Sequence, residues 1–152
     1  MTPPGDQSHM LRALSEADAA AARGEVPIGA VIVGPDGAFL AAAGNRTREL
    51  NDPTAHAELL VIRAACARLG DERLTGCDLY VTLEPWPMCA AAISFARIRR
   101  LYYGAADPKG GGVEHGARVF NHPTCHHAPE IYAGIDEERA AAVLRTFFRG
   151  RR

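Results

Sequence analysis

The chain has 152 residues, of which 47% are hydrophobic and 23% are charged, and its formal net charge is −1. These values are ordinary for a globular protein of one domain, and the near-neutral net charge does not by itself indicate binding to nucleic acid. No apolar stretch is long enough for a membrane span or a signal peptide, and four cysteines are too few for a disulfide framework, so we expect a cytoplasmic protein.

Apolar periodicity and turn residues predict that helices and strands alternate along the chain. Residues at helical spacing, β-branched runs and breaks rich in glycine or proline mark the boundaries. The expected elements are a helix at 10–23, strands at 27–33 and 38–43, a helix at 56–69, a strand at 78–83, a helix at 87–97, a strand at 99–104 and a helix at 136–148. Residues 107–129 are predicted to form a loop with one helical turn. Such an order is typical of an α/β layered domain.

The two ends of the chain differ in character. Residues 1–8 are polar with two prolines, and we expect them to be disordered. Residues 136–152 are predicted to form the C-terminal helix and a basic tail, in which Phe147 and Phe148 lie among arginines. A basic and aromatic end of this kind is suited to contact a nucleic-acid backbone. No internal repeat or low-complexity linker divides the chain, so 1–152 is predicted to be a single domain.

Two short motifs match the signature of zinc-dependent deaminases, which is H-x-E followed by P-C-x-x-C. The first is His56-Ala57-Glu58, and the second is the segment 85–89, which ends on Cys89 in register. Zinc lowers the pKa of a bound water to about 7, three protein ligands leave a fourth position for that water, and a carboxylate that is not a ligand moves the proton. His56 and Cys89 are therefore candidate ligands, and Glu58 is the candidate proton carrier.

Trp86 departs from this signature, because it stands where the motif has its first cysteine. The indole nitrogen donates a proton and has no lone pair for a metal, and we expect the ring to fill the volume that the metal and water need. Cys89 follows a predicted helix start, where the helix dipole is expected to favour its thiolate. With His56 and Cys89 alone, the site would lack a ligand.

The sequence leaves several origins of Trp86 open. The first possible origin is a natural loss of the ligand, which would leave an RNA-binding pseudoenzyme. The second is an inactivating substitution or a sequence error. The third is a change for which another ligand compensates. The residues that could supply such a ligand, or that simply cap a C-terminal loop, are His122, Cys125, His126 and His127.

Beyond the two motifs, the chain resembles the bacterial tRNA adenosine deaminases of the cytidine deaminase superfamily. The resemblance runs from about His9 to the end of the chain. The segments that carry it are 24–31, 44–46, 54–58, 88–93, 103–105, 107–111 and 147–149.

This resemblance implies a three-layer cytidine deaminase-like α/β fold, with a central five-stranded mixed sheet and helices on both faces. It implies a homodimer that deaminates the wobble adenosine of a tRNA anticodon stem-loop to inosine. It also implies one Zn²⁺ per subunit on His56 and Cys89, with Trp86 at the third ligand position, and Glu58 as the catalytic proton shuttle. The substrate-binding residues that it implies are Val26, Pro27, Ile28, Asn45, Ala57, Pro85, Asp107, Lys109, Phe147, Phe148 and Arg149.

Two other functions are compatible with the same motifs. One is a deaminase of a free base or nucleoside such as guanine or cytosine, and the other is a noncatalytic tRNA-binding or dimerisation module. The basic, aromatic C-terminus and the long match favour RNA as the substrate. Deamination assays on an anticodon stem-loop and on free nucleosides separate these possibilities.

Overall fold

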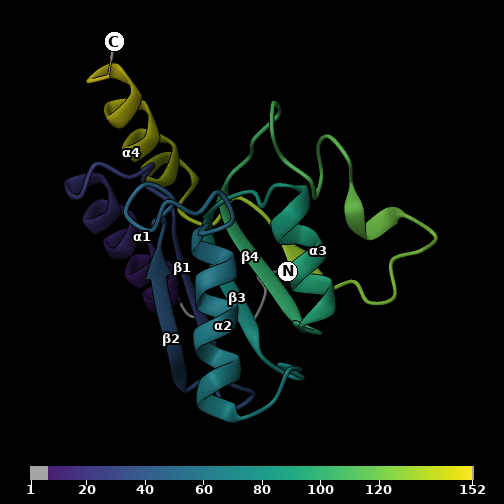
Figure 1. The fold of residues 1–152 in the computed structure, drawn as a ribbon. Coiled ribbons are helices and arrows are strands. Elements are labelled where there is room, and N and C mark those ends of the chain that lie inside the picture. Colours follow the sequence, from purple (N-terminus) through teal and green to yellow (C-terminus); the bar gives the residue numbers. More distant parts are fainter. Residues whose placement is uncertain (1–6, 152) are drawn as a thin grey trace.

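The computed structural model describes residues 7–151, in which helices and strands alternate as the sequence predicts (Figure 1). The elements are α1 (Gln7–Ala22), β1 (Gly29–Val33), β2 (Phe39–Gly44), α2 (Ala57–Leu69), β3 (Asp78–Leu83), α3 (Pro87–Phe95), β4 (Arg100–Ala105), the 3-10 helix η1 (Val119–Asn121), β5 (Glu130–Tyr132) and α4 (Glu137–Arg149). Among the described residues, none of the helices has the length and apolar character needed to cross a membrane.

The five strands form one mixed sheet in the order β2-β1-β3-β4-β5. Strand β1 pairs antiparallel with β2 and β3, whereas β3, β4 and β5 are parallel. Helices α2 and α3 cover one face of the sheet, and α1 and α4 cover the other (Figure 1). The predicted three-layer α/β fold with a five-stranded mixed sheet is confirmed.

Each face of the sheet has its own apolar core. Ile32, Val81 and Ile93 belong to the core beneath α2 and α3, whereas Val31 and Tyr102 belong to the core beneath α1 and α4. Neighbouring residues of a strand point to opposite faces, so a central strand covered on both sides is apolar throughout. All five residues of β1 are buried for this reason.

The close contact between α1 and β1 depends on a residue without a side chain. A Cβ atom at Gly29 would lie 1.9 Å from the carbonyl oxygen of Ala13 in α1. Because glycine has no Cβ, the helix can approach the strand backbone at this point. The helix thereby buries Met10 and Leu14 against the sheet.

The structure corrects three boundaries. The disorder predicted for residues 1–8 is wrong for Gln7 and Ser8, which begin α1, while residues 1–6 lie outside the described residues. Helix α3 ends two residues earlier than expected, because Arg97 takes a left-handed conformation with φ 62°. Strand β5 was not located from the sequence, since its three residues are exposed or half-buried and show no apolar run.

Candidate active site

Three side chains that can bind a metal meet at the starts of α2 and α3. His56 is the N-cap residue of α2, Glu58 lies in the first turn of α2, and Cys89 lies in the first turn of α3. Their ligand atoms all lie within 4.8 Å of one another. Within residues 7–151, this is the one group of three or more His, Cys, Asp or Glu side chains found in a metal-binding arrangement.

Burial sets the protonation of these three groups when no cation is bound. Glu58 is 4% exposed, and burial raises the pKa of its carboxyl to about 7. Burial, followed by the charge of Glu58, raises the pKa of the Cys89 thiol, and burial lowers the pKa of His56. With no cation bound, desolvation therefore outweighs the favourable effect that the helix start is expected to have on the Cys89 thiolate. A divalent cation would reverse this balance by favouring thiolate and carboxylate.

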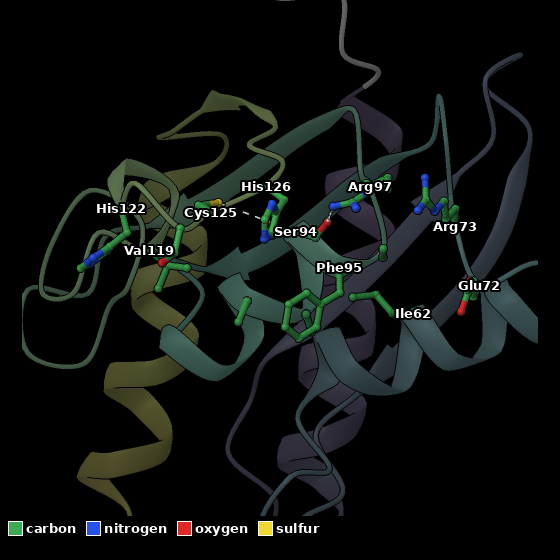
Figure 2. A pocket seen from close by; sticks show the side chains of 14 residues that line it. Ile62, Glu72, Arg73, Ser94, Phe95, Arg97, Val119, His122, Cys125 and His126 are labelled. Carbon is green, nitrogen blue, oxygen red and sulfur yellow. Dashed lines mark hydrogen bonds between the residues drawn. The ribbon is translucent and has the colours of Figure 1, made fainter.

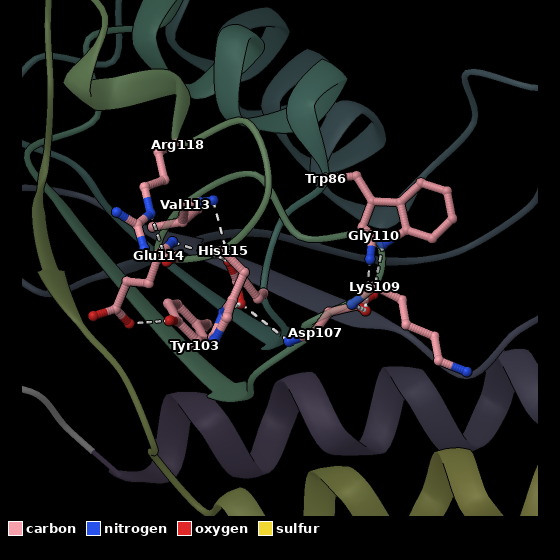
Figure 3. A network of polar contacts seen from close by, with 10 residues as sticks. Trp86, Tyr103, Asp107, Lys109, Gly110, Val113, Glu114, His115 and Arg118 are labelled. Carbon is pink, nitrogen blue, oxygen red and sulfur yellow. Dashed lines mark hydrogen bonds and ion pairs between the residues drawn. The ribbon is translucent and has the colours of Figure 1, made fainter.

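Trp86 lines the site instead of filling it. The residue is the N-cap of α3, its side chain is 47% exposed, and its Nε1 donates a hydrogen bond of 2.7 Å to Oδ2 of Asp107 (Figure 3). The indole ring lies edge-on to the His56 imidazole, with 6.1 Å between the ring centroids. The hydrogen bond to Asp107 thus holds the indole against one wall of the site.

A cavity of about 590 Å³ opens above the metal-donor group, at the ends of β3 and β4. In sheets with parallel strands, the carboxyl ends are where ligands usually bind. Besides His56, Glu58 and Trp86, the predicted residues that line it are Val26, Ile28, Asn45, Asp107, Lys109 and Phe148. The predicted substrate residues that do not line it are Pro27, Ala57, Pro85, Phe147 and Arg149.

These five residues contribute in other ways. Pro27 and Pro85 are buried beside the cavity wall, and Ala57 uses its backbone N–H to bond Oδ1 of Asn45 at 2.8 Å. Phe147 lies in a groove between α1 and α4, where the guanidinium of Arg151 stands 4.1 Å from its ring centroid. Arg149 is exposed at the end of α4.

The loop after β2 is held at the cavity by two polar side chains. Asn45 is buried and caps the start of α2 through its bond to the Ala57 N–H, which would otherwise lack a partner. Glu25 is 1% exposed and accepts hydrogen bonds from the backbone N–H groups of Arg48 and Glu49 at 3.1 and 2.8 Å. The sequence reasoning missed Glu25, although an acidic residue in an apolar stretch is a signal for it.

The loop after β4 is organised by Glu84, which the sequence reasoning also missed. Its carboxylate is buried, accepts backbone N–H bonds from Asp107 and from residues 113–115 at 3.0–3.1 Å, and lies 2.7 Å from Nδ1 of His115. Tyr103 donates to Glu114 in the same network (Figure 3). The available signal was an acidic residue directly after a buried strand. Glu84 thus fixes the loop that carries Asp107 and Lys109 into the cavity.

The histidines and cysteine of the C-terminal loop lie elsewhere. Nε2 of His122 and of His127 each donates to a backbone carbonyl at 2.7 Å, and Sγ of Cys125 donates to the carbonyl of His127 at 3.2 Å. His126 lines a separate cavity with His122 and Cys125 (Figure 2). Within the described residues, none of the four belongs to the metal-donor group, and His122, Cys125 and His127 instead bond backbone carbonyls.

Comparisons with known proteins match almost the whole chain. The family model described as the cytidine and deoxycytidylate deaminase zinc-binding region matches residues 4–105. The tRNA-specific adenosine deaminase of Agrobacterium fabrum is 65% identical over 148 residues, which are 97% of each chain. A solved structure from a study of A-to-I editing by tRNA:A34 deaminases at the wobble position of transfer RNA is 65% identical. It covers 91% of this chain and 100% of its own, with a TM-score of 0.90. A guanine deaminase of Bacillus subtilis is 43% identical over 67% of this chain and 65% of its own, with a TM-score of 0.65.

Proposed function

Because the chain belongs to the cytidine and deoxycytidylate deaminase family, we propose that it is built to deaminate the wobble adenosine of a tRNA anticodon to inosine. The observation that carries the proposal is the group of His56, Glu58 and Cys89 at the base of the 590 Å³ cavity. The 65% identity to a tRNA-specific adenosine deaminase over nearly the whole chain supports tRNA as the substrate, whereas the guanine deaminase matches only two thirds of it.

The proposed reaction is hydrolysis at a purine ring. The oxygen of a water molecule bonds to C6 of adenine, and the amino group leaves as ammonia. A zinc ion on this site would supply hydroxide at neutral pH by lowering the pKa of the attacking water. Glu58 is the residue in position to carry the water proton to the ring and then to the amine. Its raised pKa of about 7 suits a group that must both accept and return a proton near neutral pH.

The rest of the cavity is suited to a nucleoside taken out of a stacked RNA strand. Because Oδ1 of Asn45 accepts the Ala57 N–H, its amide N–H₂ is the end that can donate to a base or ribose. Lys109 brings a positive charge to the cavity wall, and Phe148 brings an aromatic ring that is 54% exposed. Bases stack on exposed aromatic rings in single-stranded RNA recognition. A tRNA substrate also implies a cytoplasmic location.

Trp86 reduces the proposed turnover. The motif supplies zinc ligands at His56 and Cys89 only, and a catalytic zinc site commonly has three protein ligands. A noncatalytic tRNA-binding protein is therefore the second candidate function. The hydrogen bond from Trp86 to Asp107 favours this noncatalytic candidate, because the indole engages a carboxylate that an adenosine in the cavity would otherwise meet.

We also propose that two copies of the chain form a dimer. Phe95 at the end of α3 is 74% exposed, and it stands beside a cavity of about 660 Å³ whose lining includes Ile62 and Val119 (Figure 2). In a two-fold dimer, the Phe95 ring of each copy can enter the cavity of the other and contact Ile62 and Val119 there. Phe95→Glu should convert the dimer to a monomer in size-exclusion chromatography with light scattering, and a monomeric unmodified chain would refute the proposal.

The test of function compares the unmodified chain with its Trp86→Cys and Trp86→Ala variants. Each is loaded with zinc and assayed on an anticodon stem-loop, free adenosine and free guanine. We expect Trp86→Cys to deaminate the stem-loop far faster than the other two, because only cysteine adds a ligand. Equal gains for cysteine and alanine would show that the indole acts by bulk alone. Efficient turnover of free guanine would overturn the assignment to tRNA.

A further inference from the structure

We infer that Glu58 is the third metal ligand of this chain, in place of the thiolate that is absent at position 86. The inference rests on the proposed zinc-dependent function, since it concerns the same site. It assigns Glu58 a role that differs from the proton shuttle of the sequence motif. The chain would then bind zinc through His56, Cys89 and Glu58 and retain little capacity for deamination.

The geometry of the donor atoms suits such a site. The ligand atoms of His56, Glu58 and Cys89 lie within 4.8 Å of one another. Zinc–ligand lengths of about 2.0–2.3 Å place the ligand atoms of a tetrahedral site about 3.3–3.6 Å apart. A contraction of roughly 1 Å between these atoms therefore brings them to tetrahedral spacing.

Other side chains of the cavity cannot provide the third bond. The indole of Trp86 offers no lone pair and donates to Asp107, whose other oxygen, Oδ1, accepts the N–H groups of Lys109 and Gly110. Glu84 is engaged by four backbone N–H groups and His115.

Glu58 is different from these carboxylates. Its Oε1 is a buried oxygen that has no hydrogen-bond partner in the described part of the chain. A buried polar atom without a partner is costly, and a cation removes that cost. The carboxyl also interacts with the Cys89 thiol and its own backbone N–H, so a bound metal would satisfy the one oxygen that lacks a partner.

Charge balance points to the same ligand. A neutral imidazole and one thiolate would leave a zinc ion with one uncompensated positive charge in a buried site, which is unfavourable. Adding the Glu58 carboxylate gives two negative ligands and one neutral ligand, so the ion and its ligands are neutral together. The motif with two cysteines reaches the same total, and Glu58 thus restores the charge that Trp86 removes.

The consequence for catalysis follows from basicity and position. A carboxylate bound to zinc is a weaker base and is held at the metal, so it is a poor carrier for the proton of the attacking water. Zinc retention and fast turnover are then separate properties in this chain. Trp86→Cys should release Glu58 from the metal and allow it to move protons.

The experiment measures zinc affinity by competition with a chromophoric chelator in four proteins, which are the unmodified chain, Glu58→Gln, Trp86→Cys and the double variant. In the unmodified chain, which should hold one zinc, Glu58→Gln should weaken affinity by more than about 100-fold, because loss of a ligand exceeds the 10–100-fold cost of an outer partner. In the Trp86→Cys background, the same substitution should weaken it by no more than about tenfold. Cobalt(II) gives a second readout, since the thiolate absorption band of Cys89 should be lost with Glu58→Gln in the first background only.

Zinc binding by the double variant also shows that Glu58→Gln does not prevent folding. Equal losses in both backgrounds, or no zinc bound by the unmodified chain, would overturn the inference. The proposed function fails on a different result. It is refuted if the Trp86→Cys protein binds zinc but does not deaminate the anticodon stem-loop.

Discussion

Glu84 offers a stringent test of how the substrate loop is held. The carboxylate is 1% exposed and accepts four backbone N–H bonds in addition to its contact with the His115 imidazole. Oε2 accepts three of those bonds, and Oε1 accepts the N–H of Asp107. Glu84→Gln keeps the shape of the side chain but removes its charge and replaces one acceptor oxygen by a donor.

The cost can be estimated from these bonds. If the amide oxygen takes the place of Oε2, three bonds change from charged to neutral, and each loses about 1 kcal/mol. The Asp107 N–H then faces an amide N–H₂ and lacks an acceptor, which costs at least about 1 kcal/mol more. We therefore expect Glu84→Gln to lower the free energy of unfolding by about 4 kcal/mol. For a protein of this size, that corresponds to a fall in Tm of roughly 12 °C.

The same substitution should have a defined pH dependence. Burial by itself raises the pKa of Glu84, but the hydrogen bonds from Asp107, His115 and Val113 outweigh it and set the pKa below the ordinary value of 4.5. A carboxyl whose pKa is lower in the folded state contributes its full stability above about pH 4.5, and it loses this contribution as the pH falls through the folded-state pKa. The stability difference between the two proteins should be complete at pH 7 and shrink below pH 4.5.

Urea unfolding and thermal melts followed by circular dichroism measure both quantities. Glu138→Gln is the matched control, because Glu138 is exposed on α4 and its loss should change stability by no more than about 0.5 kcal/mol. A Glu84→Gln protein as stable as the unmodified chain at pH 7 would refute the loop-anchoring role.

Three further predictions follow from the same site. A Cβ at Gly110 would lie 2.5 Å from the indole ring of Trp86, so Gly110→Ala should lower the free energy of unfolding in urea by about 2 kcal/mol. The same substitution should have almost no effect in a Trp86→Cys background, and equal losses in both backgrounds would show that the ring is not the obstacle. Trp86 is the single tryptophan of the sequence, so Asp107→Ala should shift its fluorescence to the red and increase quenching by iodide, whereas unchanged emission would mean that the hydrogen bond does not hold the indole in solution. In zinc-free protein, burial raises the pKa of Glu58 to about 7, so the folded state loses stability as the pH rises from about 4.5 to 7. The Glu58→Gln protein should therefore be about 3 kcal/mol more stable than the unmodified chain at pH 8 and equal to it at pH 4. Equal stabilities at pH 8 would contradict the raised pKa of Glu58.

Local patterns were sufficient to locate most of the fold. The β-branched run of β1 indicates a strand covered on both sides, and the structure buries all five of its residues. Helix α2 ends at Gly70, whose φ of 68° is the left-handed conformation that glycine adopts easily. Strand β5 could not be located this way, because its three residues gain their order from pairing with β4 and not from an apolar pattern.

The chemical identity of the site was also determined by the sequence. The spacing of His56, Glu58 and Cys89 indicates two helix starts that carry metal-binding groups, and the residue at position 86 shows that one thiolate is absent. Those conclusions depend on residue type and short-range spacing alone. Such information is complete in the sequence.

Only the tertiary structure decided what surrounds those residues. The indole of Trp86 turns to Asp107, which lies 21 residues further along the chain, and Glu84 is buried under a loop that begins at the end of the neighbouring parallel strand. Both contacts arise because β3 and β4 end at the same edge of the sheet and bring their following loops together. The direction of a side chain with several rotamers depends on partners from distant segments, so Trp86 could be recognised from the sequence as a lost ligand but not as one wall of an open cavity.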